Sequence, residues 1–98
     1  MSIDFEKQVS KIIPLIESAD GYLDCEKLII NNIREQLANG VTNPDVEGYL
    51  KKLHHYFDQQ IIKKQSTAGC INYGYAAGFV NTLITTPYWR SWINATKL

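Results

Sequence analysis

The sequence predicts a single all-α domain, a bundle of four or five helices, and three observations indicate it. Its 98 residues suffice for one hydrophobic core and not for two. The composition, 45% hydrophobic and 20% charged, is typical of a folded globular protein. Apolar residues recur at helical spacing in successive segments that short turn signals separate. We therefore expect residues 1–98 to form one helical domain.

The first predicted helix has its apolar residues on one face. They follow the spacing i, i+4, i+7, i+8, i+11 and are Phe5, Val9, Ile12, Ile13 and Ile16. Ser2 has the residue type of an N-cap. Pro14 lacks a backbone donor and disfavours α geometry in the residue before it, so we expect a kink or an early stop there. Residues 18–21, Ser-Ala-Asp-Gly, then predict a turn.

The second predicted helix covers about residues 23–38. Asn39 and Gly40 predict its end, because Gly takes the left-handed conformation at little steric cost. Its apolar stripe consists of Leu23, Ile30, Ile33 and Leu37.

The third predicted helix has the clearest start signal in the chain. Asn43 is expected to be the N-cap, and Pro44 fills the first helical position, where no donor is needed. The helix is expected to end near Lys63 and Lys64, whose charges suit a helix C-terminus. Its apolar positions are Val46, Leu50, Leu53 and Phe57.

The segment between Lys64 and Arg90 has no charged residue and is rich in aromatic and small residues. Its apolar run is shorter than the about 20 residues of a membrane span and is interrupted by asparagine, so we predict a central fourth helix, buried on most sides. A short strand stays open as an alternative, because large side chains alternate over 71–75. The small residues expected to let a neighbouring helix approach closely are Gly74, Ala77 and Gly78.

The C-terminal segment is a candidate for partner binding. Thr86 and Pro87 repeat the cap-then-proline signal and predict a short last helix. The segment carries Trp, Tyr and Arg, the residue types enriched in interface hot spots. The same types close the end of a small core, and both roles hold if one Trp packs inward and the other stays exposed. The partner-binding candidates here are Tyr88, Trp89, Arg90 and Trp92.

Charge is unevenly divided along a chain whose net charge is zero. Residues 1–47 hold nine acidic and four basic residues, a net charge of −5, and residues 48–98 hold one acidic and six basic residues, a net charge of +5. Either the two halves neutralise each other, or an acidic face that includes Asp20 and Asp24 is exposed to a basic partner. A basic patch beside Tyr56 is too small to predict nucleic-acid binding and consists of Lys51, Lys52, Lys63 and Lys64.

No catalytic constellation is visible in the sequence. His54 lies four residues before Asp58, but a zinc site needs three or four ligands and His55 is the only other histidine. We interpret His54 and Asp58 as a solvated pair. Neither cysteine has a local basic partner that would lower its pKa, and no glycine pattern matches a dinucleotide fingerprint. We therefore predict a protein that is not an enzyme and binds no metal and no cofactor.

The two cysteines, Cys25 and Cys70, are too far apart in sequence for a CxxC motif. Two buried free thiols, or one disulfide that joins the second and fourth helices, both stay open, and the disulfide would imply an oxidising compartment. Residues 1–6 lack the basic region of a signal peptide, so we expect a cytoplasmic protein. A periplasmic location is the alternative if a leader has been removed.

Two short motifs resemble the Tai-type immunity proteins, small helical bacterial proteins that neutralise peptidoglycan amidases delivered by type VI secretion. That family carries a cysteine shortly after a leucine near the start of an early helix, which is similar to Leu23-Asp24-Cys25. It also has a later cysteine near a Gly-Tyr-x-x-Gly-x-x-Asp stretch, which is similar to Cys70 followed by GYAAGFVN at 74–81. Here asparagine replaces the final acid, and the cysteine lies two residues further from the Gly-Tyr pair. In size and helix count the chain also resembles the cytoplasmic immunity proteins of pediocin-like bacteriocins.

These resemblances imply a non-enzymatic inhibitor that binds and occludes a toxin or effector protein, as a monomer or a homodimer. The alternative is a helical adaptor, chaperone or regulatory subunit whose exposed groove holds a partner helix. We expect neither a nucleic-acid partner nor a membrane span.

Overall fold

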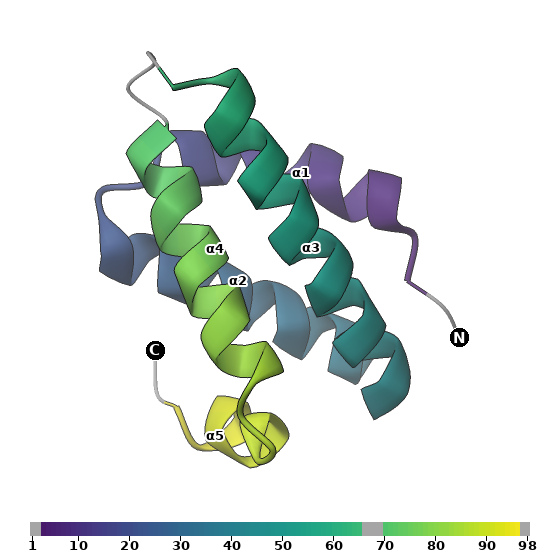
Figure 1. Cartoon of the computed structure of the whole chain (residues 1–98). Coiled ribbons are helices and arrows are strands. Elements are labelled where there is room, and N and C mark those ends of the chain that lie inside the picture. Colours follow the sequence, from purple (N-terminus) through teal and green to yellow (C-terminus); the bar gives the residue numbers. More distant parts are fainter. Residues whose placement is uncertain (1–2, 66–69, 97–98) are drawn as a thin grey trace.

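The computed structural model describes residues 3–65 and 70–96. Over these residues the chain forms helices and no strand (Figure 1). The helices are α1 (Phe5–Glu17), α2 (Tyr22–Ala38), α3 (Asn43–Lys63), α4 (Cys70–Ile84) and α5 (Trp89–Ala95). The predicted four- or five-helix all-α bundle is confirmed. The alternative of a strand over 71–75 is wrong, because these residues lie inside α4.

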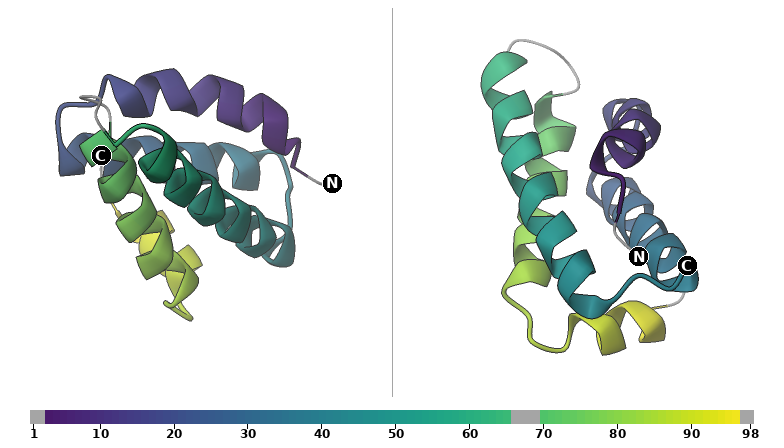
Figure 2. Two further views of the ribbon diagram at one scale, coloured as in Figure 1. Left: turned by 45° about the horizontal axis from the view of Figure 1, so that its top comes forward. Right: turned by 90° about the vertical axis from the view of Figure 1, so that its right-hand side faces the viewer.

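The helices pack in two layers, which Figure 2 shows edge-on. One layer is the hairpin of α1 and α2, the other is the pair α3 and α4, and the short α5 lies across one end of both. α4 packs against α3, α2 and α1, so it has the central position that its uncharged sequence predicts. The core between the layers includes the fully buried side chains of Tyr73, Phe57, Phe79, Ile30, Ile33 and Leu50. No helix in the described part of the chain is long and apolar enough to cross a lipid bilayer.

The first helix runs through Pro14 to Glu17, so the expected early stop is wrong. A proline at this position leaves one carbonyl, that of Ser10, without its helical donor. Both Ser10 and Pro14 are exposed, and water can bond this carbonyl. The helix begins after Asp4, whose Oδ1 accepts a hydrogen bond from the backbone N–H of Lys7 over 3.2 Å. The cap predicted at residue 2 lies outside the described residues.

The second and third helices have nearly the predicted ends. Gly40 follows α2 with φ of 84°, the left-handed conformation that its stop signal predicts. The N-cap of α3 is Thr42, one residue before the predicted Asn43, and its Oγ1 accepts from the N–H of Asp45 over 3.4 Å. Asn43 is the first helical residue, and its Oδ1 accepts instead from Nη1 of Arg90 over 2.6 Å.

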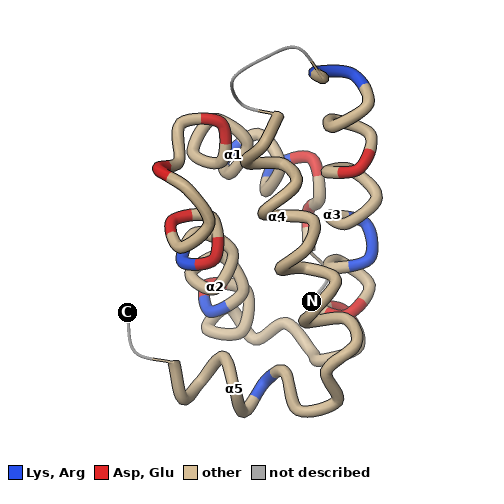
Figure 3. Tube along the Cα trace, turned by 60° about the vertical axis from the view of Figure 1, so that its left-hand side comes forward, with Lys and Arg blue, Asp and Glu red and all other residues tan. Residues whose placement is uncertain are grey.

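The glycines of α4 do not have the predicted role. Gly74 and Gly78 lie on the exposed side of the helix, and a Cβ added at either would meet no atom within 4 Å. Ala77, the third small residue of the prediction, is buried as expected, and Ala76 beside it is buried too. Figure 3 shows α4 as a helix without charge beside the charged helices α2 and α3. An uncharged helix offers no polar stripe that marks its solvent side, so its sequence did not reveal which face is exposed.

Candidate functional site

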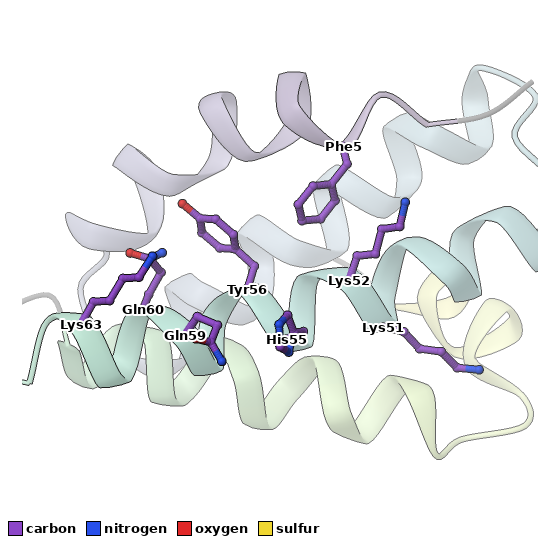
Figure 4. Close-up of a pocket in the computed structure, with 8 residues that line it drawn as sticks. All are labelled: Phe5, Lys51, Lys52, His55, Tyr56, Gln59, Gln60 and Lys63. Carbon is purple, nitrogen blue, oxygen red and sulfur yellow. The ribbon is translucent and has the colours of Figure 1, made fainter.

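A cleft beside α3, which Phe5 of α1 also lines, is the candidate binding site (Figure 4). Its volume is about 480 Å³, within the range of sites that bind ligands or anchor side chains. Seven of its eight lining residues come from α3 and recur at helical spacing, so they share one face of that helix. The lining residues are Phe5, Lys51, Lys52, His55, Tyr56, Gln59, Gln60 and Lys63.

The floor of the cleft is aromatic. Phe5, in the first turn of α1, meets Tyr56 of α3 edge to face, with ring centroids 6.2 Å apart and planes at 70°. Phe5 also meets Tyr49 edge to face at 6.1 Å. Edge-to-face pairs of this kind stabilise the packing beyond the area that they bury. The three rings therefore join α1 to α3 and hold the cleft in shape.

A buried polar network fixes Tyr49 beneath this floor. The Tyr49 hydroxyl donates to Oδ1 of Asn32 over 2.6 Å, and Nδ2 of Asn32 donates to Oε1 of Gln8 over 2.9 Å. All three side chains are buried, so the network links α1, α2 and α3 where water does not compete. Burial raises the pKa of Tyr49, which keeps its hydroxyl protonated and able to donate. Because Phe5 packs on Tyr49, the network also positions the cleft.

The rim of the cleft is positively charged. Lys51, Lys52 and Lys63 are exposed, and none of them forms an ion pair within the described part of the chain. Nζ of Lys52 lies 6.0 Å from the centroid of the Phe5 ring, a distance typical of a cation–π contact. Among the residues that the structure describes, no Asp or Glu lines the cleft. The arrangement favours a ligand that has an apolar body and carries negative charge.

The basic patch predicted from the sequence is thus present in part. Tyr56 and three of the four lysines come together in the cleft. The fourth, Lys64, donates to Oε2 of Glu17 instead. Its spacing places Phe5 in the apolar stripe of the first helix, and only the position of that helix opposite α3 makes Phe5 part of the site.

The aromatic C-terminal candidates are divided between core and surface. Trp89 is 4% exposed, and its Nε1 donates to Oε1 of Glu47 over 3.2 Å. Trp92 is 39% exposed and packs on Phe79 with ring centroids 5.6 Å apart. Tyr88 is 77% exposed. One Trp therefore closes the end of the bundle, while the other and Tyr88 stay accessible on α5 and the turn before it.

The acidic candidates lie in the turn before α2 and in its first turn. The backbone N–H of Asp20 donates to Oδ2 of Asp24 over 2.9 Å, so the two residues form a local turn contact. Asp20 is exposed and Asp24 is partly buried. Neither residue lines the cleft, which lies between α1 and α3.

The predicted His54–Asp58 pair is present on α3, with Nδ1 and Oδ2 3.5 Å apart. Both side chains are partly exposed, and neither lines the cleft. Within the described ranges, no three His, Cys, Asp or Glu side chains gather closely enough to hold a metal ion.

Both cysteines are free, so the structure does not contain the disulfide left open as an alternative. The two thiols face different partners. Sγ of Cys25, buried under α4, donates to the carbonyl of Asn72 at 3.8 Å. Sγ of Cys70 donates to the carbonyl of Ile61 on α3 at 3.7 Å. Burial, and secondarily the charge of Asp24, raises the pKa of Cys25, which disfavours a reactive thiolate.

The start of α2, with Leu23-Asp24-Cys25, lies beside α4, which carries residues 74–81. Sγ of Cys25 donates to the Asn72 carbonyl in the first turn of α4. The rings of Tyr22 and of Tyr75, on α4, meet edge to face with centroids 5.8 Å apart. The chain matches no known family model, no curated protein and no solved structure.

Proposed function

We propose that this protein is a non-enzymatic inhibitor that binds a partner protein and occludes it, and that the cleft between α1 and α3 receives the partner. The toxin-neutralising role follows the resemblance of the two motifs. The observation that carries the binding proposal is the cleft itself, in which three lysines without an acidic counterpart surround an aromatic floor.

The chemistry of this surface supports recognition of a protein. Tyr and Phe rings supply contact area at low conformational cost, and aromatic residues are enriched in the buried centres of interfaces. Unpaired lysines at the rim attract an acidic surface and accelerate its association. The rim of the cleft is basic, which favours an acidic partner. The acidic residues of the N-terminal half would instead favour a basic partner. Tyr88 and Trp92 offer a second apolar surface at the other end of the bundle.

The free thiols support a reducing compartment. Cys25 and Cys70 are unpaired, and disulfides are rare in the cytoplasm, where thiols stay reduced. We therefore propose a cytoplasmic partner and a cytoplasmic site of inhibition, in preference to the periplasm.

The alternative function is an adaptor or regulatory subunit. It is favoured by the position of the cleft between two helices, since a groove of this kind can hold the amphipathic helix of a partner. The two functions differ in their effect on the partner. An inhibitor abolishes the partner's activity on binding, whereas an adaptor leaves that activity intact and changes where or when it is used.

The experiment uses charge reversal in the cleft. Candidate partners, taken from proteins captured on the immobilised chain and from the products of neighbouring genes, are purified and titrated with the wild type. A triple variant, Lys51→Glu, Lys52→Glu and Lys63→Glu, is compared with a control variant, Lys7→Glu and Lys27→Glu, which changes exposed lysines outside the cleft. We expect the triple variant to lose at least about tenfold in affinity and the control to bind like the wild type.

The same titration measures the partner's activity. Loss of activity in step with binding supports the inhibitor, and full activity in the complex supports the adaptor. Equal binding by the triple variant and the wild type would contradict the assignment of the cleft. A turnover activity of this protein that depends on His54 would contradict a non-enzymatic role.

A further inference from the structure

Resting on the proposed function, we infer the chemical form of the segment that the cleft holds. It is an acidic amphipathic α-helix with an apolar side chain on the floor of Phe5 and Tyr56 and carboxylates at both ends, about three turns apart. Three properties of the cleft lead to this form: the spacing of its charges, the apolar centre between them, and the backbone of its walls.

The positive charges stand at opposite ends of the cleft. Lys52 and Lys63 are eleven positions apart on one face of α3, which corresponds to about 16 Å along the helix axis at about 1.5 Å per residue. Figure 4 shows the side chains of Lys51 and Lys52 at one end and that of Lys63 at the other. A single phosphate or carboxylate cannot reach both ends. An occupant that neutralises both must carry separated negative charges.

The centre of the cleft is suited to an apolar side chain. Figure 4 places Phe5, on α1, and Tyr56, on α3, between the lysines, where the two contacting rings form the floor. Gln59 and Gln60 flank these rings without adding charge. An aliphatic or aromatic side chain in this position would be desolvated against the rings, while the carboxylates on either side of it stay at the wetter rim.

The walls of the cleft favour a helical occupant over an extended one. A peptide that binds as an added strand takes its affinity from backbone hydrogen bonds to a sheet edge. The cleft is lined by helices, by one face of α3 and by Phe5 of α1, and backbone groups within the helix body bond to one another. A helix satisfies its own backbone and needs only side-chain contacts. Residues eleven positions apart on a helix lie three turns apart on the same face, which matches the spacing of Lys52 and Lys63.

The test uses designed peptides with no natural sequence. A fluorescent, alanine-based helical peptide carries a leucine between two glutamates spaced eleven positions apart. A control peptide has the same composition with its glutamates five positions apart, on different faces. Fluorescence anisotropy is measured against the wild type, and circular dichroism verifies that each variant is folded. We expect the eleven-spaced peptide to bind at least about tenfold more tightly than the control.

Charge exchange makes the test specific for the cleft. Lys52→Glu and Lys63→Glu should each weaken binding of the acidic peptide, and the double variant should bind a matched peptide that carries lysines in place of its glutamates. Lys27→Glu, outside the cleft, should change nothing. If the double variant binds the lysine peptide, the charges of the cleft and of the peptide must interact. A general loss of stability in the variant could not restore binding in this way.

Three outcomes would overturn the inference. They are equal affinity for the two spacings, the absence of measurable binding to either peptide, and tighter binding of inorganic phosphate or of a short RNA at the same lysines. If the purified partner depends on the three rim lysines while both peptides fail, the inference is wrong and the proposed function stands. If the partner is insensitive to those lysines, the assignment of the cleft as the partner's site in the proposed function fails as well.

Discussion

The hydroxyl of Tyr73 donates a hydrogen bond to Oε2 of Glu17 over 2.5 Å and so fastens α4 to the last residue of α1. Tyr73 is fully buried, and burial is the main reason that its pKa is raised. Glu17 also accepts from Lys64, and this bond is the largest cause of its lowered pKa, followed by the bond from Tyr73. At neutral pH the Tyr73 hydroxyl is therefore protonated and donates to a charged Glu17 carboxylate.

Tyr73→Phe is expected to destabilise the protein by about 1 kcal/mol. The bond involves a charged group, which strengthens it, but the Glu17 side chain is 35% exposed, which weakens it through solvent screening. Urea unfolding of Tyr73→Phe, Glu17→Gln and the double variant forms a double-mutant cycle. The sum of the losses in unfolding free energy of the two single variants should exceed the loss in the double variant. Strictly additive losses would show that the two residues are not coupled.

The pH dependence of stability should reveal the charge on Glu17. Its pKa in the folded protein is lowered from the ordinary value of 4.5, so the unfolded chain takes up the proton first as the pH falls. The stabilisation is therefore complete above about pH 4.5 and is lost as the pH falls through the folded pKa. The stability difference between the wild type and Glu17→Gln should shrink in acid. A difference that stays constant from pH 7 to pH 3 would contradict this account.

Alanine at the exposed glycines of α4 is expected to stabilise the protein. Gly74 and Gly78 are helical, and a Cβ at either meets no atom within 4 Å, so Gly74→Ala and Gly78→Ala should each add about 0.8–1 kcal/mol to the free energy of unfolding. Gly40 has equally open surroundings but a φ of +84°. Gly40→Ala should therefore destabilise by about 1 kcal/mol. Thermal unfolding of the three variants tests this difference in sign.

Arg34 of α2 is expected to hold α5 in place. Its Nη2 donates to the carbonyl of Ile93 over 2.7 Å and to that of Thr96. α5 has seven residues, too few for a stable isolated helix. Arg34→Met keeps most of the side-chain volume and removes the donors, so it should cost about 1.5–3 kcal/mol and lower the hydrogen-exchange protection of α5 first. Unchanged protection of α5 would rule out this role for Arg34.

The two thiols should differ in reactivity. Cys25 is fully buried and its pKa is raised, whereas Cys70 is partly exposed. Under native conditions iodoacetamide should alkylate Cys70 at least about tenfold faster than Cys25, and denaturant should remove the difference. Peptide mass spectrometry measures both rates. A protein that accepts no label until it is reduced would indicate a disulfide and contradict the free thiols.

Periodicity and stop signals in the sequence predicted the helices well, because both are local. The Asn39-Gly40 signal and the Lys63-Lys64 signal lie where α2 and α3 end. Leu23 shows that apolar periodicity does not predict burial reliably in the first turn of a helix. The spacing places Leu23 in the apolar stripe of the second helix, yet its side chain is 67% exposed, because it lies in the first turn of α2, beyond the part of the stripe that faces the core.

The candidate site could be predicted only in part. Tyr56 and its neighbouring lysines were visible as a patch, because they belong to one helix. Phe5 comes from α1, and nothing local in the sequence distinguishes it from the other apolar residues of that helix. Its role in the cleft depends on the Tyr49–Asn32–Gln8 network that places α1 against α3.

The sequence by itself determined the all-α class, the order of the helices and the uncharged character of α4, since these depend on neighbours along the chain. Tertiary packing decided how each face is used. Lys63 and Lys64 are identical in type and adjacent in sequence, yet Lys63 lines the cleft and Lys64 binds Glu17. Successive residues at the end of a helix point about 100° apart, so what each one meets depends on which helix packs alongside.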